Sequence, residues 1–309
     1  MMSDYNIREM IDNKKGRRST VFIEKAVPVI LLLITSVSVL TTIGILVTLL
    51  SETVMFFTRV SPVEFLTSTE WSAFSSDPEW GIFALIMGTM KITVIAVAFA
   101  VPIGLGAAIY LSEYASDRVR RTIKPILEIL AGIPTVVYGF FALTFVTPLI
   151  RGIWPEVNLF NAISPGLVVG VMIIPMIASL SEDAMSSVPN TMREGALGLG
   201  STRLEMVFKV VLPAAVSGIM ASIVLAVSRA IGETMIVSIA AGSTPNASLN
   251  IMESLQTMTG FIVQVASGDA TYGSDVYFSL YAVGMTLFVF TLLMNVISQW
   301  FSRKFREEY

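Results

Sequence analysis

Two oppositely charged residues, Arg229 and Glu233, stand four positions apart inside a long apolar stretch of the chain. On one continuous helix this spacing would place both side chains on the same face. If that helix lies in a membrane, an exposed charge costs on the order of 3 kcal/mol, so the pair must face protein or water. Either the two charges neutralise each other and stabilise a helical bundle, or Arg229 lines a path for an anion, because its planar fork of donors matches several acceptor oxygens.

Two weaker candidates for the same path are Thr135 and Lys91. Thr135 follows Pro134, which cannot donate a backbone hydrogen bond. The Thr135 hydroxyl would either face the path or satisfy a carbonyl group that the proline leaves free. Lys91 stands near one end of its apolar stretch, where a lysine usually extends its ammonium group to the membrane surface, and we expect it to do so.

The residue types that are absent exclude most catalytic chemistry. The chain has no Cys and no His, which removes disulfides, Cys/His zinc sites and His-ligated haem, and also the commonest general base. We therefore expect no cofactor, no metal site and no enzymatic activity in this chain. A membrane enzyme would need a catalytic cluster, and one Arg–Glu pair is a poor candidate.

The composition is typical of a membrane protein. Of the 309 residues, 54% are hydrophobic and 14% are charged, whereas a soluble domain has about 25% charged residues. The net charge of −3 gives no reason to expect a nucleic-acid partner. A helix needs about 20 apolar residues to cross the lipid. The sequence predicts an all-α, polytopic membrane protein with six such stretches, residues 26–50, 82–112, 125–150, 162–181, 210–241 and 276–301.

Lys and Arg are unevenly divided between the segments that join these stretches. Sixteen lie in the N-terminal arm (1–25), the tail (303–309) and the loops after the second and fourth stretches, while only Arg59 and Arg151 lie on the other side. Positive charge is enriched on the cytoplasmic side, so both termini are expected to be cytoplasmic.

Two long segments, 51–81 and 242–275, would then be external, the first as a periplasmic loop. Within the second, apolar residues over 251–265 are spaced as in a helix that is too short to span. We expect it to lie at the membrane interface or to re-enter the membrane, and to end at Gly268.

The loop between the fourth and fifth stretches has the signals of two short helices joined by a sharp turn. Asn190 is placed to cap the first helix, and Gly200 to end it in the left-handed conformation. Thr202 and Glu205, three positions apart, have the pattern of a capping box. Pro213 can occupy the start of the fifth span, where no backbone donor is needed. The sequence predicts a compact helical knob that docks into a groove of another protein.

This loop resembles the EAA motif of ABC-importer permeases, which has Glu-Ala-Ala, three residues, Gly, nine residues and Ile-x-Leu-Pro. The chain has Glu194-Gly195-Ala196, three residues, Gly200, and after nine more residues Val210-Val211-Leu212-Pro213. Only Gly195 and Val210 depart from the motif, both by small changes in size. The resemblance implies that the loop 182–212 couples the chain to a separate ATPase through Arg193, Glu194, Ala196, Gly200, Leu212 and Pro213.

Three further segments resemble one branch of this family, the Pst-type phosphate permeases of the PstC-like kind. They are Gly-Ile-Pro-Thr-Val-Val-Tyr-Gly from Gly132, Arg-Ala-Ile-Gly-Glu-Thr-Met from Arg229, and the stretch from Val188 to Glu194. The resemblance covers roughly residues 82–302 and implies a MetI-like domain of five spans there, after one extra N-terminal helix at 26–50. It also implies that Arg229 and Glu233 are essential for the passage of phosphate.

The resemblance implies several partners in the bacterial inner membrane. A second homologous permease would complete the pore, and an ATP-binding cassette dimer would hydrolyse ATP, since this chain has no Gly-x4-Gly-Lys-Ser/Thr sequence. A periplasmic or lipoprotein phosphate-binding protein would deliver the substrate, and the pore would open to each side in turn.

Two alternatives stay open. A permease of the same class could carry another oxyanion, such as sulfate or molybdate, since a guanidinium suits any of them. A secondary transporter working alone needs an internal inverted repeat or a pair of broken helices, and the sequence predicts neither.

Overall fold

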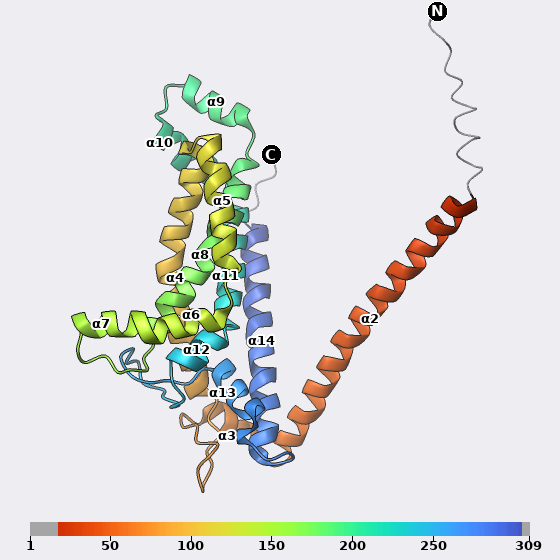
Figure 1. The fold of residues 1–309 in the computed structure, drawn as a ribbon, viewed down its shortest axis with the longest axis vertical. Helices are drawn as coiled ribbons and strands as arrows, with labels where there is room; N and C mark the ends of the chain where they lie inside the picture. Colours follow the sequence, from red (N-terminus) through yellow and green to blue (C-terminus); the bar gives the residue numbers. More distant parts are fainter. Residues whose placement is uncertain (1–17, 305–309) are drawn as a thin grey trace, which may run out of the picture. The chain divides into compact units, whose positions relative to one another are not determined.

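The computed structural model of this chain describes residues 18–304, which form helices and loops (Figure 1). The N-terminal arm up to residue 17 and the tail from residue 305 lie outside the described residues. The chain divides into two compact units, Met1–Ser51 and Glu52–Tyr309. The helices are α2 (Arg18–Phe57), α3 (Pro62–Thr67), α4 (Phe83–Ile109), α5 (Asp117–Ala131), α6 (Thr135–Phe141), α7 (Thr147–Ile153), α8 (Ile163–Ser186), α9 (Asn190–Gly198), α10 (Arg203–Met206), α11 (Leu212–Ile231), α12 (Met235–Ala240), α13 (Met258–Gln264) and α14 (Asp275–Lys304).

Six helical segments of the described region are long and apolar enough to cross a membrane, so the predicted number of spans is confirmed. The first is longer than predicted at both ends. The segments are Glu24–Phe57, Phe83–Tyr114, Thr135–Ile153, Ile163–Ser186, Arg203–Ile231 and Asp275–Ile297.

The predicted third span, 125–150, is wrong at its start, because the helix breaks between α5 and α6. Pro134 has no backbone donor, and it disfavours the helical conformation for the residue before it. α5 therefore ends at Ala131, and a new helix begins at Thr135. Its charged residues make α5 too polar to belong to the span.

The predicted fifth span, 210–241, is also broken, and it begins earlier than predicted. α11 ends at Ile231 with Gly232 as its cap, and α12 begins at Met235. At the other end, α10 continues into α11 through a π-helical turn, Val207–Val211. Within residues 18–304, two of the predicted spans are thus interrupted, and the expectation that no pair of helices is broken is wrong.

The second unit is built around α4 and α8, with α11 packed against α8 and α14 against α11 (Figure 1). Glycines allow the close contacts: a Cβ atom on Gly170 would lie 3.0 Å from the Ala96 carbonyl oxygen, and one on Gly218 would lie 2.5 Å from the Ala184 Cβ. α6 and α7 run across the direction of α4 and α8, and α12 packs on α6.

Gly88 in α4 offers a test of this packing. A Cβ atom there would lie 2.1 Å from the Gln256 carbonyl oxygen, which belongs to backbone that cannot move aside cheaply. We expect Gly88→Ala to lower the melting temperature of the purified protein in detergent by roughly 2–10 °C. Gly106→Ala, in the same helix but with open space at its Cβ, is the control. Equal melting temperatures for the two variants would contradict this packing.

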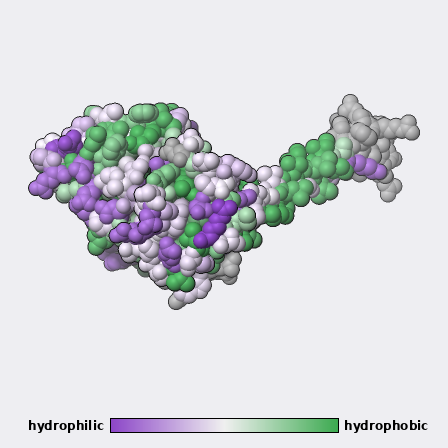
Figure 2. Space-filling model, turned by 90° about the horizontal axis from the view of Figure 1, so that it is seen from below, coloured by the Kyte–Doolittle hydropathy of each residue, from purple (hydrophilic) through white to green (hydrophobic). Residues whose placement is uncertain are grey.

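The end of the second unit that carries α3 and α13 has an aromatic cluster at its core. Edge-to-face contacts join Phe56 to Phe65 and Trp80, and Trp71 to Trp80 and Phe261. Figure 2 views the molecule from this end, where hydrophilic side chains gather over part of the face. The cluster anchors residues 56–82 on α13 and α14.

The short helix expected at 251–265 begins later than predicted. Thr257 caps α13 by accepting a hydrogen bond from the Gly260 backbone N–H, whereas Asn246 and Asn250 accept from the backbone two residues on and turn the preceding chain. The predicted end is confirmed, because Gly268 has a φ of 104°.

Candidate functional site

The predicted helical knob (residues 190–206) is present as α9 and α10. The Thr202 hydroxyl accepts from the Glu205 backbone N–H at 3.3 Å, and the Glu205 carboxylate accepts from the Thr202 N–H at 3.0 Å. The capping box is therefore confirmed. The predicted cap of α9 is wrong: Asn190 is the first helical residue, and Pro189 precedes it as the cap residue.

The turn between the two helices depends on Gly200, which has a φ of 90°. Its N–H donates to the Leu197 carbonyl at 3.0 Å, and the Ser201 N–H donates to the Ala196 carbonyl at 3.1 Å. The predicted left-handed end of the first helix is confirmed, and these two bonds form a Schellman motif. The shape of the knob is thus fixed by local hydrogen bonds.

The knob presents an exposed apolar tip. Leu199 is 91% exposed, and three further large apolar side chains of the loop are exposed with it, Leu197, Leu204 and Phe208. Glu194 and Gly200 are exposed beside them, while Ala196 is half-buried against the cluster beneath. An exposed apolar patch of this kind marks an interaction surface.

The last two motif residues, Leu212 and Pro213, lie at the start of α11. The π-helical turn before them lets the Leu212 N–H bond to the Val207 carbonyl, five residues back. Pro213 has no backbone N–H and therefore needs no acceptor. The wider π-helical turn next to it thus leaves no donor of Pro213 unpaired. Leu212 packs on the cluster that holds the knob, and Pro213 is exposed.

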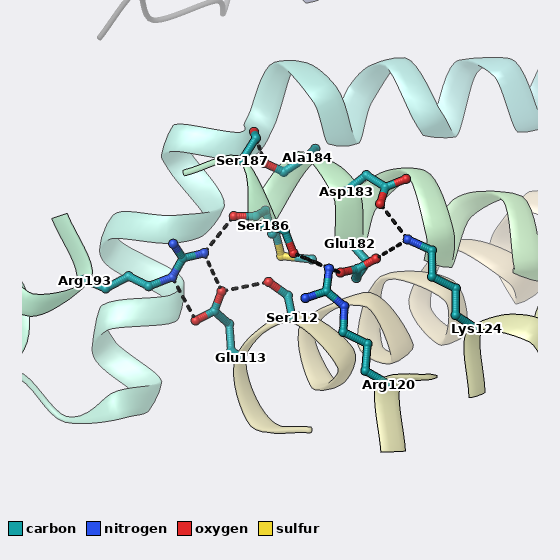
Figure 3. Close-up of polar contacts among 11 residues, drawn as sticks. Ser112, Glu113, Arg120, Lys124, Glu182, Asp183, Ala184, Ser186, Ser187 and Arg193 are labelled. Atoms are coloured by element: carbon teal, nitrogen blue, oxygen red, sulfur yellow. Dashed lines mark hydrogen bonds and ion pairs between the residues drawn. The ribbon is translucent and has the colours of Figure 1, made fainter. Parts of the chain in front are cut away.

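The Arg193 side chain points toward Glu113 and the end of α8 (Figure 3). Its guanidinium pairs with the buried Glu113 carboxylate, with Nη2–Oε1 2.9 Å and Nε–Oε2 3.3 Å. It also donates to the carbonyl groups of Met185 and Val188 at the end of α8. Arg193 therefore positions the knob and does not form part of its exposed surface.

A second cluster of charges lies at the same end of the bundle. Glu182 of α8 is 1% exposed and pairs with Arg120 and Lys124 of α5 (Figure 3). Hydrogen bonds to Asp183 and Glu182 raise the pKa of the Lys124 ammonium group, so it stays charged. The sequence analysis did not identify Glu113 and Glu182 as partners of these basic side chains. The only signal was their position, directly after the predicted second and fourth apolar stretches.

Arg229 and Glu233 do not share a helix face, contrary to prediction, because α11 ends between them. Arg229 lies exposed in the last turn of α11, with the Met172 Sδ 4.0 Å from its Nη2. Glu233 is buried, and its carboxylate accepts from the backbone N–H groups of Met235 and Ile236 at 3.1 and 3.3 Å. Among the described residues no ion pair joins Arg229 to Glu233, which instead caps α12.

Thr135 is the first residue of α6 and is half-buried. Four residues on, a Cβ atom at Gly139 would lie 3.1 Å from the Met235 carbonyl oxygen, so the first turns of α6 and α12 meet closely. The structure thus brings together the two segments that follow the helix breaks.

Lys91 is buried within the chain, whereas the sequence predicts a side chain that extends to the membrane surface. Its side chain is 8% exposed, and its ammonium group donates to the Asn250 carbonyl at 3.4 Å. The reason is the loop 242–257, which folds over the end of α4 and offers that carbonyl.

Comparisons with known proteins give a consistent family. Residues 100–307 match the family described as binding-protein-dependent transport system inner membrane component. The chain is 36% identical over 245 residues to the probable ABC transporter permease YqgH of Bacillus subtilis, covering 79% of each chain. It is 34% identical over 256 residues to the phosphate transport system permease PstC of Mesorhizobium japonicum, covering 76% of this chain and 77% of that one.

Solved structures share the fold. A bacterial ABC transporter for import of the polysaccharide alginate matches with a TM-score of 0.65 and 17% identity, over 94% of this chain and all of that one. The inward-facing MetNI methionine ABC transporter matches with a TM-score of 0.57 and 19% identity, over 72% of this chain and 94% of that one. The predicted MetI-like fold is confirmed.

Proposed function

This chain belongs to the binding-protein-dependent inner-membrane transport components and is a PstC-like ABC-importer permease; on that premise we propose that it forms half of the translocation pore of an ATP-driven phosphate importer. It is a multi-pass inner-membrane transport subunit. The proposed part is the substrate, the partners and the way in which the pore opens.

The position of Arg229 carries the proposal for an anion. An exposed guanidinium on an apolar spanning helix is costly to leave in lipid, so a water-filled path or a partner must face it. Phosphate near neutral pH has several acceptor oxygens that suit its fork of donors. The relatives named as phosphate permeases favour phosphate over other oxyanions.

Glu233 and Thr135 are assigned to the same path in a supporting role. Glu233 holds the start of α12, and Thr135 starts α6, which packs on α12. These two segments would position the pore lining near Arg229. The pore half assigned here corresponds to residues 82–302, with 26–50 as an added helix.

The partners follow from the exposed surfaces. The apolar tip of the knob would seat in an ATPase subunit on the cytoplasmic side, and both termini would lie on that side. A second permease would cover exposed apolar side chains of α6, of α7 and of the π-helical turn between them, among them Phe140, Phe141, Phe145, Leu149 and Ile153. A phosphate-binding protein would meet the external loops.

The mechanism proposed is alternating access. ATP binding closes the two ATPases and draws the two knobs together, which opens the pore outward for phosphate. Hydrolysis separates the knobs, and the pore opens inward. Binding of phosphate has to remain weak enough for release.

The test is uptake of radiolabelled phosphate by vesicles that contain this chain, its second permease and the ATPases, with the binding protein outside. We expect ATP-dependent uptake of labelled phosphate. Excess unlabelled phosphate should suppress this uptake, whereas sulfate or molybdate at the same concentration should not. Suppression by sulfate or molybdate would assign the pore to another oxyanion. Uptake by this chain without any ATPase would identify a secondary transporter, a class that the two broken helices alone would permit.

A further inference from the structure

We propose that the ion pair between Glu113 and Arg193 is the rigid link that carries movement of the knob into the membrane bundle. The inference rests on the proposed function, because it assigns how an ATPase bound at the knob moves the pore. Glu113 and Arg193 are positioning residues in this account, and neither contacts the substrate.

One guanidinium joins three separate segments. Arg193 stands on α9, its two bonds to Glu113 reach the π-helical turn Tyr110–Tyr114 at the end of α4, and its bonds to Met185 and Val188 reach the end of α8. The contact at Met185 measures 2.7 Å. α4 and α8 are the two helices with the most extensive packing in the unit, so the pair connects the knob directly to its centre.

Both partners of this ion pair are largely buried, whereas the cations paired with Glu182, Arg120 and Lys124, are 37% and 30% exposed. The side chains of Arg193 and Glu113 are 15% and 4% exposed. Solvent screens a buried pair little, and its bidentate geometry fixes direction as well as distance. By contrast, Lys209 and Glu205 form an exposed pair within the loop itself and tie it to nothing else.

The knob itself buries few of its side chains. No residue of α9 is buried, and α10 buries only Met206. A second polar contact reaches the same π-helical turn, since the Arg203 guanidinium lies 5.5 Å from the centre of the Tyr114 ring. The helix from α10 into α11 and the packing of Met192, Ala196 and Met206 on the apolar cluster also hold the knob, and Arg193 adds the polar link to the ends of α4 and α8.

The π-helical turn explains why Glu113 can reach Arg193. An added residue in a helical turn shifts the next side chain by about 100° around the axis. The turn at Tyr110–Tyr114 thereby directs Glu113 toward α8 and α9. Within the same turn, the Ser112 hydroxyl donates a hydrogen bond of 2.8 Å to the Glu113 carboxylate. The turn and the ion pair form one device.

The experiment measures phosphate taken up per ATP hydrolysed in vesicles that contain the complete complex. We expect Glu113→Gln to lower this ratio by about fivefold or more, with the ATPase still bound and still hydrolysing ATP. Asp275→Asn, which removes the exposed pair with Arg59, is the matched carboxylate-to-amide control and should keep the wild-type ratio.

A covalent replacement of the link separates transmission from a simple loss of folding. The chain has no native Cys, so Glu113→Cys with Arg193→Cys gives a unique pair of thiols in this subunit. We expect little phosphate taken up per ATP hydrolysed while the thiols are free. This ratio should return toward the wild-type value when a short bifunctional thiol reagent joins the two thiols.

Two results would overturn the inference: a wild-type ratio in Glu113→Gln, or a joined double-cysteine variant that stays uncoupled. Both are read against wild-type vesicles that import phosphate. If the wild-type vesicles themselves import none, the proposed function fails, which is a different outcome.

Discussion

Replacing Arg229 by alanine is expected to abolish phosphate uptake while the complex still assembles. Charge-assisted hydrogen bonds contribute about 1.5–3 kcal/mol each, so loss of the fork should lower the uptake rate at limiting phosphate by about a hundredfold or more. Assembly should survive, because Arg229 is exposed and forms no ion pair with the described residues of its own chain. The Glu233 carboxylate accepts hydrogen bonds from the first backbone N–H groups of α12 and forms no pair with Arg229.

The measurement is initial uptake of labelled phosphate in vesicles, together with co-purification of the ATPase. Arg151→Ala is the matched control, since Arg151 is an exposed arginine in the last turn of another spanning segment. We expect normal uptake in the control. Uptake at normal affinity in Arg229→Ala would remove Arg229 from the path.

A leucine at position 200 is expected to uncouple transport from ATP hydrolysis. Gly200 has a φ of 90°, and a side chain in that left-handed region costs about 1–2 kcal/mol. The cost falls on the Schellman turn that orients α10 and the apolar tip. Glu194→Lys tests the same surface by charge reversal, without touching the backbone.

Gly195→Ala is the control for these variants. Gly195 lies within α9 with open space at its Cβ, so alanine should favour the helix by about 0.5–1 kcal/mol and leave transport intact. The readouts are ATPase binding and ATP-driven uptake. Normal values of both in Gly200→Leu and in Glu194→Lys would refute the assignment of the knob as the ATPase docking site.

Features set by nearby residues were the ones that could be predicted from the sequence. The six spans follow from length and hydropathy, and the turn at Gly200 and the Thr202–Glu205 box follow from rules that act within six residues. Both helix breaks had local signals as well, at Pro134 and Gly232. They were missed because apolar residues continue on both sides, so that hydropathy gives one unbroken stretch.

Contacts between distant residues could not be predicted from a single sequence. Glu113 and Arg193 are 80 positions apart, and Lys91 and Asn250 are 159 positions apart. In each case the partner belongs to a segment whose place is decided by the packing of whole helices. The structure therefore places Arg193, Glu233 and Lys91 in contacts that the sequence does not predict.

The π-helical turn at Val207–Val211 fixes the angular phase between the apolar tip and Arg229. Leu204 of the tip and Arg229 lie near opposite ends of one continuous helical segment, Arg203–Ile231. A single surplus residue in that turn sets their mutual rotation, since one residue amounts to about 100° around a helix axis. If this turn tightened to regular α-helix with all its residues kept, Arg229 would lie about 100° away from its present side of the helix axis, so the wide turn matters for the pore as much as the side chains do.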